Sequence, residues 1–180
     1  MKKIAAASLL SMASMTASAT GFVSLDVDHV NDDRTNRNST AQFVRAGKTI
    51  DGINLGLTSR TAAAEQGGLR NSLELSVGKK IGAISPFVGV AYDNGLNGAP
   101  GKSYQYGLVG ATTGANIGPG FALAGIKTRL NWDSDNPKQT VIFATYRVPV
   151  AKDVGININV GKSLQDIRET SLGAGLNFRF

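Results

Sequence analysis

Apolar and polar residues alternate one by one along most of the chain. In residues 154–162, for example, Val154, Ile156, Ile158 and Val160 alternate with glycine and asparagine. Successive side chains of a β-strand point to opposite faces, so this period of two predicts strands with one apolar and one polar face. Ten such segments, most of them ~9–11 residues long, follow one another, and this is the length that a tilted strand needs to cross a bilayer. They are residues 21–29, 42–50, 53–61, 72–80, 84–93, 104–111, 121–132, 140–148, 154–162 and 170–180.

The segments are separated by stretches rich in glycine, proline, aspartate and asparagine, which predict turns and loops. Asp51-Gly52 is typical of a tight hairpin turn. Connections after the second, fourth and eighth segments are short, whereas those after the first, third, fifth, seventh and ninth are mostly longer and more polar. Antiparallel membrane barrels show this asymmetry between their two ends. Residues 112–120 are the exception, because they form a long connection where a short one is expected. If the strands are assigned in the wrong register there, the barrel has eight strands instead of ten.

The last segment carries the clearest alternation, with Leu172, Ala174, Leu176, Phe178 and Phe180 on one face. An edge strand without a partner invites aggregation, so we expect this strand to close the sheet onto the first one. Its ending resembles the C-terminal signature of Gram-negative outer-membrane β-barrels, a terminal phenylalanine preceded by apolar residues at alternate positions. The resemblance implies that the barrel-assembly machinery binds the strand ending in Phe180, and that the protein lies in the cell outer membrane.

The N-terminal residues predict export. Lys2 and Lys3 precede an apolar stretch that runs to about Met15, and Ala17-Ser18-Ala19 is typical of a cleavage site. This stretch is too short to span a bilayer, which takes ~20 apolar residues. We therefore expect residues 1–19 to be a signal peptide and residues 20–180 to form the barrel.

Composition agrees with a single exported domain. Without Lys2 and Lys3 the chain has 17 basic and 13 acidic side chains and no basic run, so we expect no nucleic acid partner. It has no cysteine, and therefore no disulfide framework. A soluble β-sandwich is the alternative fold, but its outward faces would carry many charges. Here the apolar faces carry almost none apart from Lys48 and Lys79 near strand ends. We therefore predict an all-β fold, a transmembrane antiparallel up-and-down barrel of ten strands.

The polar face of the strands predicts what the barrel encloses. Its charged residues are Asp26, Asp28, Arg45, Arg60, Glu74, Lys127, Arg129, Arg147 and Arg179. Enclosed charges must be paired or solvated, so one interpretation is a structural network that fills the lumen. The other is a constriction that favours anions, because basic residues outnumber acidic ones. Ten strands leave a narrow lumen at most. We expect neither a cofactor nor a metal ion there.

Aromatic side chains at strand ends predict the two membrane interfaces. Tyr92, Tyr104 and Trp132 lie at loop ends of the apolar face, and Tyr146, Phe178 and Phe180 lie toward the opposite rim. The expected partners are outer-membrane lipid and lipopolysaccharide, and we expect a monomer.

Two classes of enzyme share this architecture. Asp28, His29, Asp32 and Asp33 cluster near the end of the first segment, but barrel proteases resembling omptins are far longer. Lipid A deacylases pair a serine with a late histidine, which this chain lacks. We therefore expect no enzyme. The two functions left open are a narrow channel with a net basic lumen and a plugged small barrel with a structural or adhesin-like role through its loops. The loop residues available for such contacts are Arg34, Arg37, Lys102, Lys138 and Arg168.

Overall fold

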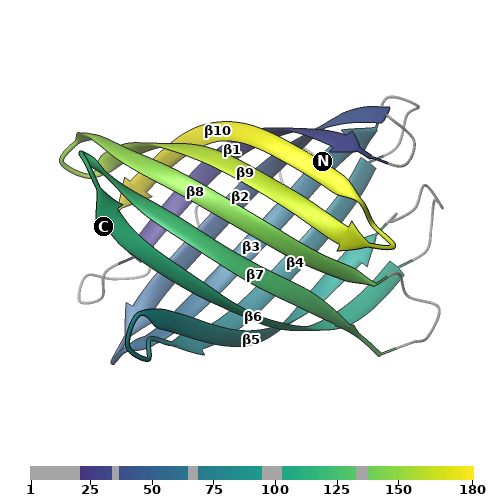
Figure 1. The fold of residues 1–180 in the computed structure, drawn as a ribbon, viewed down its shortest axis with the longest axis horizontal. Helices are drawn as coiled ribbons and strands as arrows, with labels where there is room; N and C mark the ends of the chain where they lie inside the picture. Colours follow the sequence, from purple (N-terminus) through teal and green to yellow (C-terminus); the bar gives the residue numbers. More distant parts are fainter. Residues whose placement is uncertain (1–20, 34–36, 65–68, 95–102, 133–137) are drawn as a thin grey trace.

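The computed structural model describes residues 21–33, 37–64, 69–94, 103–132 and 138–180, which form ten antiparallel strands (Figure 1). The predicted signal peptide lies outside the described residues. The strands are β1 (Gly21–Asp32), β2 (Arg37–Ile50), β3 (Ile53–Ala64), β4 (Leu69–Lys79), β5 (Ile84–Asn94), β6 (Ser103–Ile117), β7 (Gly120–Asn131), β8 (Gln139–Ala151), β9 (Val154–Gln165) and β10 (Glu169–Arg179).

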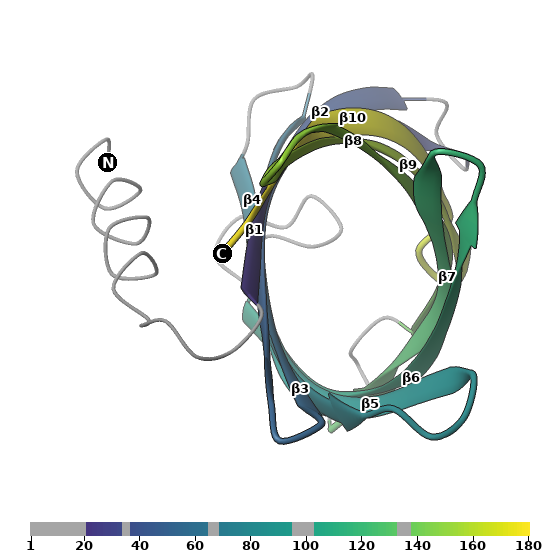
Figure 2. The same ribbon diagram turned by 90° about the vertical axis from the view of Figure 1, so that its left-hand side faces the viewer.

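Each strand pairs with the next in sequence, and β1 pairs with β10, so the sheet is a closed barrel. Figure 2 shows the resulting ring of strands. At the seam the backbone N–H of Gly21 donates to Phe180 O at 2.9 Å, and that of Phe180 donates to Gly21 O at 3.1 Å. Closure leaves no edge strand without a partner. The prediction of ten strands is confirmed, and the alternative of eight is wrong.

The connections differ in length between the two ends of the barrel. One end has the two-residue turns 51–52, 118–119 and 152–153 and the connection 80–83. The other end has the connections 33–36, 65–68, 95–102, 132–138 and 166–168, which include the longest ones. The prediction that residues 112–120 form a turn is wrong. β6 continues to Ile117, which pairs with Gly120 of β7, and Gly118 turns the chain with a positive φ of 55°. Residues 112–115 have small side chains and show no alternation of apolar and polar positions. Their backbones nevertheless pair with β7, because backbone hydrogen bonds do not require that alternation.

The outer surface of the barrel is apolar. Large aliphatic side chains are exposed on every strand, for example Val88 at 57% and Ile158 at 49%. Among the described residues no helix is long and apolar enough to cross a membrane. We call the ring of exposed aliphatic side chains on the ten strands, which includes Val88 and Ile158, the apolar belt. It is the reverse of a soluble protein, which rarely exposes a large contiguous apolar patch.

The interior is correspondingly polar. Asp26, Asn157 and Asn177 are among the most deeply buried side chains of the described residues. Two small apolar clusters also lie inside, one of them formed by Val30, Ala41 and Ala62. The barrel is thus an inverted fold, in which the polar face of each strand is enclosed, as the alternation predicts.

The face assignment of β6 was wrong. Tyr104 was expected on the outer face, but it packs against Tyr106 and Leu108, which are buried with Ala91 of β5. Both faces of this strand carry apolar residues, so alternation alone did not distinguish them. These large side chains lie in the lumen because they fill its volume.

Candidate functional site in the lumen

Asp26 is the centre of the first luminal network. Its Oδ2 accepts a hydrogen bond from Ser24 Oγ at 2.8 Å and forms an ion pair with Arg45 of β2. Its Oδ1 accepts hydrogen bonds from Asn157 Nδ2 at 3.1 Å and Asn159 Nδ2 at 3.0 Å, both from β9. Alternation places all of these side chains on the inner faces of their strands. A fully buried carboxylate is therefore compensated by one cation and three neutral donors.

Positive charge gathers at the end of the lumen that has the short turns. Arg147 Nε donates to Asn157 Oδ1 at 3.1 Å, and the guanidinium lies 5.2 Å from the centre of the Phe22 ring. Arg179 lies on the luminal face of β10 and pairs in register with Phe22. None of the ion pairs found among the described residues includes Arg147 or Arg179. Their charge is therefore available to an ion in the lumen.

A second network surrounds Glu74 of β4. Lys127 Nζ lies 2.5 Å from Glu74 Oε2, and Arg129 Nη2 lies 3.4 Å from Glu74 Oε1. Arg129 also contacts Asp93 Oδ2 through Nη1 at 3.0 Å and lies over the ring of Tyr106. Lys127 and Arg129 come from β7, three steps around the barrel from β4. These side chains reach over the intervening strands and occupy the lumen.

A third group of charges lies at the end that carries the longer connections. Glu169 Oε2 accepts a hydrogen bond from Arg60 Nη2 at 3.2 Å, and Glu169 Oε1 lies 3.6 Å from Arg70 Nη1. Glu169 begins β10, whereas Arg60 and Arg70 belong to β3 and β4. β10 and β4 are four steps apart in a ring of ten, so this pair crosses most of the lumen.

The sequence reasoning missed Arg70, Asp93 and Glu169. Arg70 and Glu169 were assigned to loops, because the strands extend a few residues further than their alternation shows. Asp93 could have been predicted, because it lies two residues after Ala91 of β5 and therefore on the same inner face. Among the residues named from the sequence, Asp26 contacts Arg45, and Glu74 contacts Lys127 and Arg129, so they meet in two separate groups rather than in one network.

A luminal cavity of about 90 Å³ touches both the Glu74 and the Glu169 groups. Its charged lining includes Arg60, Glu74, Lys127, Arg129 and Glu169. The Nε atoms of Arg60 and Arg129 and the hydroxyl of Tyr106 are buried without a protein partner. Buried polar groups are normally satisfied, so ordered water is the natural partner. This volume holds a few water molecules or a small ion.

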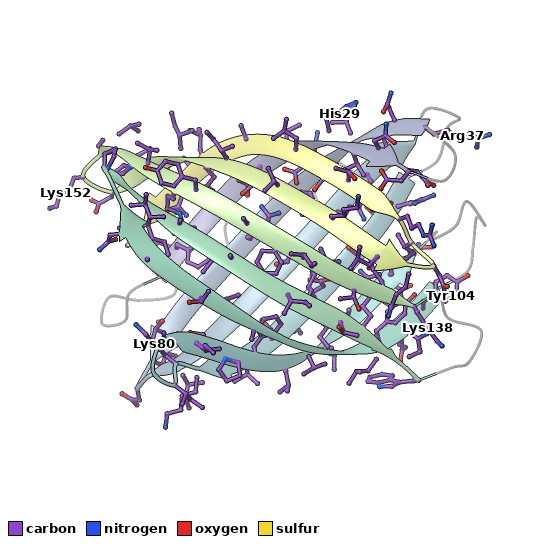
Figure 3. The ribbon with its side chains drawn as sticks, in the orientation of Figure 1. His29, Arg37, Lys80, Tyr104, Lys138 and Lys152 are labelled. Carbon is purple, nitrogen blue, oxygen red and sulfur yellow. The ribbon has the colours of Figure 1, made fainter. Side chains whose placement is uncertain are left out.

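The acidic residues and the histidine near the end of β1 do not form a site. Asp28 is buried on the luminal face, next to Gly173, and its Oδ1 has no protein partner. His29 lies on the opposite face and projects outward (Figure 3). Asp33 accepts hydrogen bonds from Thr170 Oγ1 and lies 3.7 Å from Lys162 Nζ. Within the described ranges, no group of three or more His, Cys, Asp or Glu side chains is placed to hold a metal ion.

Five of the six predicted interface aromatics lie on the outer surface. Tyr92 and Trp132 are exposed at the end with the longer connections, and the Tyr92 hydroxyl lies 2.8 Å from Ser103 Oγ. Phe178 and Phe180 are exposed near the opposite end, where the Tyr146 hydroxyl donates to Ile117 O at 2.9 Å. Tyr104 is the exception, because it lies inside with Tyr106.

Comparison with known proteins identifies the fold. No protein-family model and no curated protein sequence matches the chain. Among solved structures, the β domain of the Bordetella autotransporter Brka is 12% identical, with a TM-score of 0.50 over 90% of this chain and 99% of that one. Neisserial surface protein A (12% identical, TM-score 0.49, 91% and 100% covered) and the NanC porin (11%, 0.44, 87% and 100%) are also similar.

The fold is therefore that of the outer-membrane β-barrels. The apolar belt agrees with this class, because exposed aliphatic side chains around a closed barrel match the hydrocarbon of a bilayer. Fold and surface together fit a barrel whose outer face meets the hydrocarbon of a bilayer.

Proposed function

We propose that the protein is a narrow outer-membrane channel that passes small inorganic anions. The observation that supports this most directly is the excess of positive charge in the lumen. Seven basic side chains face five carboxylates there, namely Arg45, Arg60, Arg70, Lys127, Arg129, Arg147 and Arg179 against Asp26, Asp28, Glu74, Asp93 and Glu169. Rings of basic side chains favour anions in pores.

The size of the lumen limits the substrate class. A cavity of about 90 Å³, bordered by ion pairs that cross between strands, has no room for a sugar or a peptide. Barrels that pass larger solutes use 16–18 strands. Chloride-sized ions with part of their hydration shell are therefore the proposed substrates, and Arg147 and Arg179 attract them at the short-turn end.

Planar-bilayer recording of the refolded protein tests this proposal. We expect discrete conductance steps and, in a salt gradient, a reversal potential that indicates anion preference. The double variant Arg147→Gln, Arg179→Gln should lose much of that preference, whereas Lys152→Gln in the exposed turn 152–153 is the matched control and should keep it. Absence of conductance steps, or preference for cations, would overturn the proposal.

The cross-lumen ion pairs favour a second candidate, a plugged barrel that acts through its outer surface. Arg37 and Lys138 lie at the end with the longer connections (Figure 3), as does Arg168, whereas Arg34 and Lys102 lie outside the described residues. In this role the loops contact another cell or lipopolysaccharide phosphates. A barrel without conductance whose binding to cells is lost on deletion of residues 33–36 supports this candidate over the channel.

Delivery to the membrane is part of the proposal. The predicted signal peptide exports the chain in a Gram-negative cell, and the assembly machinery recognises the strand that ends in Phe180. The Phe180 ring lies over Gly21 on the outer face of the seam. Phe180→Ala keeps the backbone pairs of the seam, so we expect lower outer-membrane yield in cells but normal refolding in detergent. Equal yield in cells contradicts this role for the ring.

A further inference from the structure

We infer that the connection between β9 and β10, residues 166–168, is an inward-folded cap that closes the lumen at the end with the longer connections. Ile167 at its centre is only 2% exposed. It is buried in one apolar cluster with Ala91 of β5 and with Tyr106 and Leu108 of β6. β5 is five steps from β10 in either direction around the ring, which makes it the diametrically opposite strand. A side chain from this connection contacts β5 and β6 only by lying across the lumen.

The cap is bound to both neighbouring connections through its backbone and the Asp166 carboxylate. The N–H of Asp33 donates to Arg168 O at 2.8 Å, which ties the cap to the end of β1. Lys138 N–H donates to Asp166 Oδ2 at 2.8 Å, and Asp166 N–H donates to Lys138 O at 3.2 Å. Because these bonds come from two sides of the barrel rim, they hold the segment over the lumen.

The turn that starts the cap adopts an uncommon backbone conformation. Gln165 has a φ of 75°, in the left-handed region that residues other than glycine rarely occupy. Arg168 Nε donates to Gln165 O at 3.2 Å and closes the turn. Such a conformation persists only where surrounding contacts over-determine it, and the burial of Ile167 supplies those contacts.

The residue that follows the cap adds an ionic contact across the lumen. Glu169 contacts Arg60 of β3 and Arg70 of β4, so the first residue of β10 is bound to the far wall as well. Ile167 and Glu169 thus reach different parts of the facing wall, β5–β6 and β3–β4. The luminal cavity touches Glu169 and Arg60, and so lies directly against this closure.

The purpose of the cap rests on the proposed channel. The test of the cap does not, because it measures access to the lumen rather than conductance. If the barrel conducts, the cap is the part that must open for an ion to pass. The closed arrangement combines one apolar side chain with one carboxylate shared by two cations. Weakening either contact therefore raises the fraction of open molecules without removing a backbone pair of the barrel.

Chemical accessibility measures the cap directly. The chain has no cysteine, so Ser72→Cys, in the lining of the luminal cavity, introduces a single thiol. The folded barrel is treated with a charged methanethiosulfonate reagent, and the labelling rate is followed by mass spectrometry. Adding Ile167→Ser or Glu169→Gln should accelerate labelling about tenfold, as expected for a closed state weakened by about 1.4 kcal/mol. Ile81→Ser, in the exposed connection 80–83, is the matched control and should leave the rate unchanged.

Equal rates in all four backgrounds overturn the cap. Glu169→Gln changes no apolar contact, so it keeps the test decisive if Ile167→Ser fails to fold. Conductance of the same variants separates the two proposals. Faster labelling without any conductance supports the cap and removes the channel, whereas equal labelling with equal conductance supports the channel and removes the cap.

Discussion

Lys127 Nζ and Glu74 Oε2 lie 2.5 Å apart although β5 and β6 separate the strands that carry them. The contact shows how the barrel fills its interior. Instead of an apolar core, long charged side chains extend over neighbouring strands and meet partners of opposite sign. Because a charge enclosed without a partner costs several kcal/mol, each of these groups is sensitive to the loss of one member.

Glu74→Gln should destabilise the barrel and increase its anion preference. The substitution leaves Lys127 without its carboxylate and leaves Arg129 with Asp93 alone. Loss of charge-assisted hydrogen bonds of this kind costs about 1–3 kcal/mol. Urea unfolding in lipid vesicles, followed by the emission of the only tryptophan, Trp132, measures the change. An unchanged midpoint contradicts a stabilising role for the Glu74 contacts.

Asp26→Asn should destabilise the barrel further, by about 2–3 kcal/mol, because Arg45 loses its counter-charge and the donors on Asn157 and Asn159 lose a charged acceptor. Asp51→Asn is the matched control, since Asp51 lies in the exposed turn 51–52 with a φ of 51°, which asparagine tolerates. The same urea titration should distinguish the two variants. Equal midpoints would falsify the central role of Asp26.

Gly173→Ala should destabilise the barrel by about 1–3 kcal/mol through overpacking. A methyl group at this position would collide with Asp28 Oδ1 and lie 2.6 Å from Val27 O, and the backbone oxygen cannot yield easily. Gly107→Ala is the control, because its nearest neighbour is a Trp132 side-chain atom 3.3 Å away on the outer face. A thermal melt monitored by gel mobility of unboiled samples checks the pair. If Gly107→Ala is the more harmful change, the packing argument fails.

Ile158→Arg should prevent or weaken insertion, because it places a cation in the apolar belt. Arginine on the lipid face of a barrel costs about 2–4 kcal/mol near the bilayer midplane. Lys152→Glu, a charge change in the exposed turn 152–153, should have little effect. The folded fraction in vesicles of fixed lipid composition is the measurement. Normal folding of Ile158→Arg would show that this face of β9 does not meet hydrocarbon.

The sequence by itself determined the alternation of apolar and polar side chains along each strand. Alternation is a local property, since each residue's face follows from its neighbours' faces. Val154 to Val160 and Leu172 to Phe180 therefore predicted both their strands and their outer faces, and the enclosed charges followed from the same parity. Closure of β10 onto β1 also followed, because an unpaired edge is unfavourable.

Tertiary structure alone decided which charges meet, which face of β6 is enclosed and where the cap lies. Glu169 pairs with Arg60 across 109 residues, a distance in sequence over which no local pattern carries information. Tyr104 and Tyr106 face inward because the lumen beside Ala91 has volume to fill, which depends on strands that lie elsewhere in the chain. Ile167 reads as an ordinary loop residue until the ring closes, and only closure brings the opposite wall within its reach.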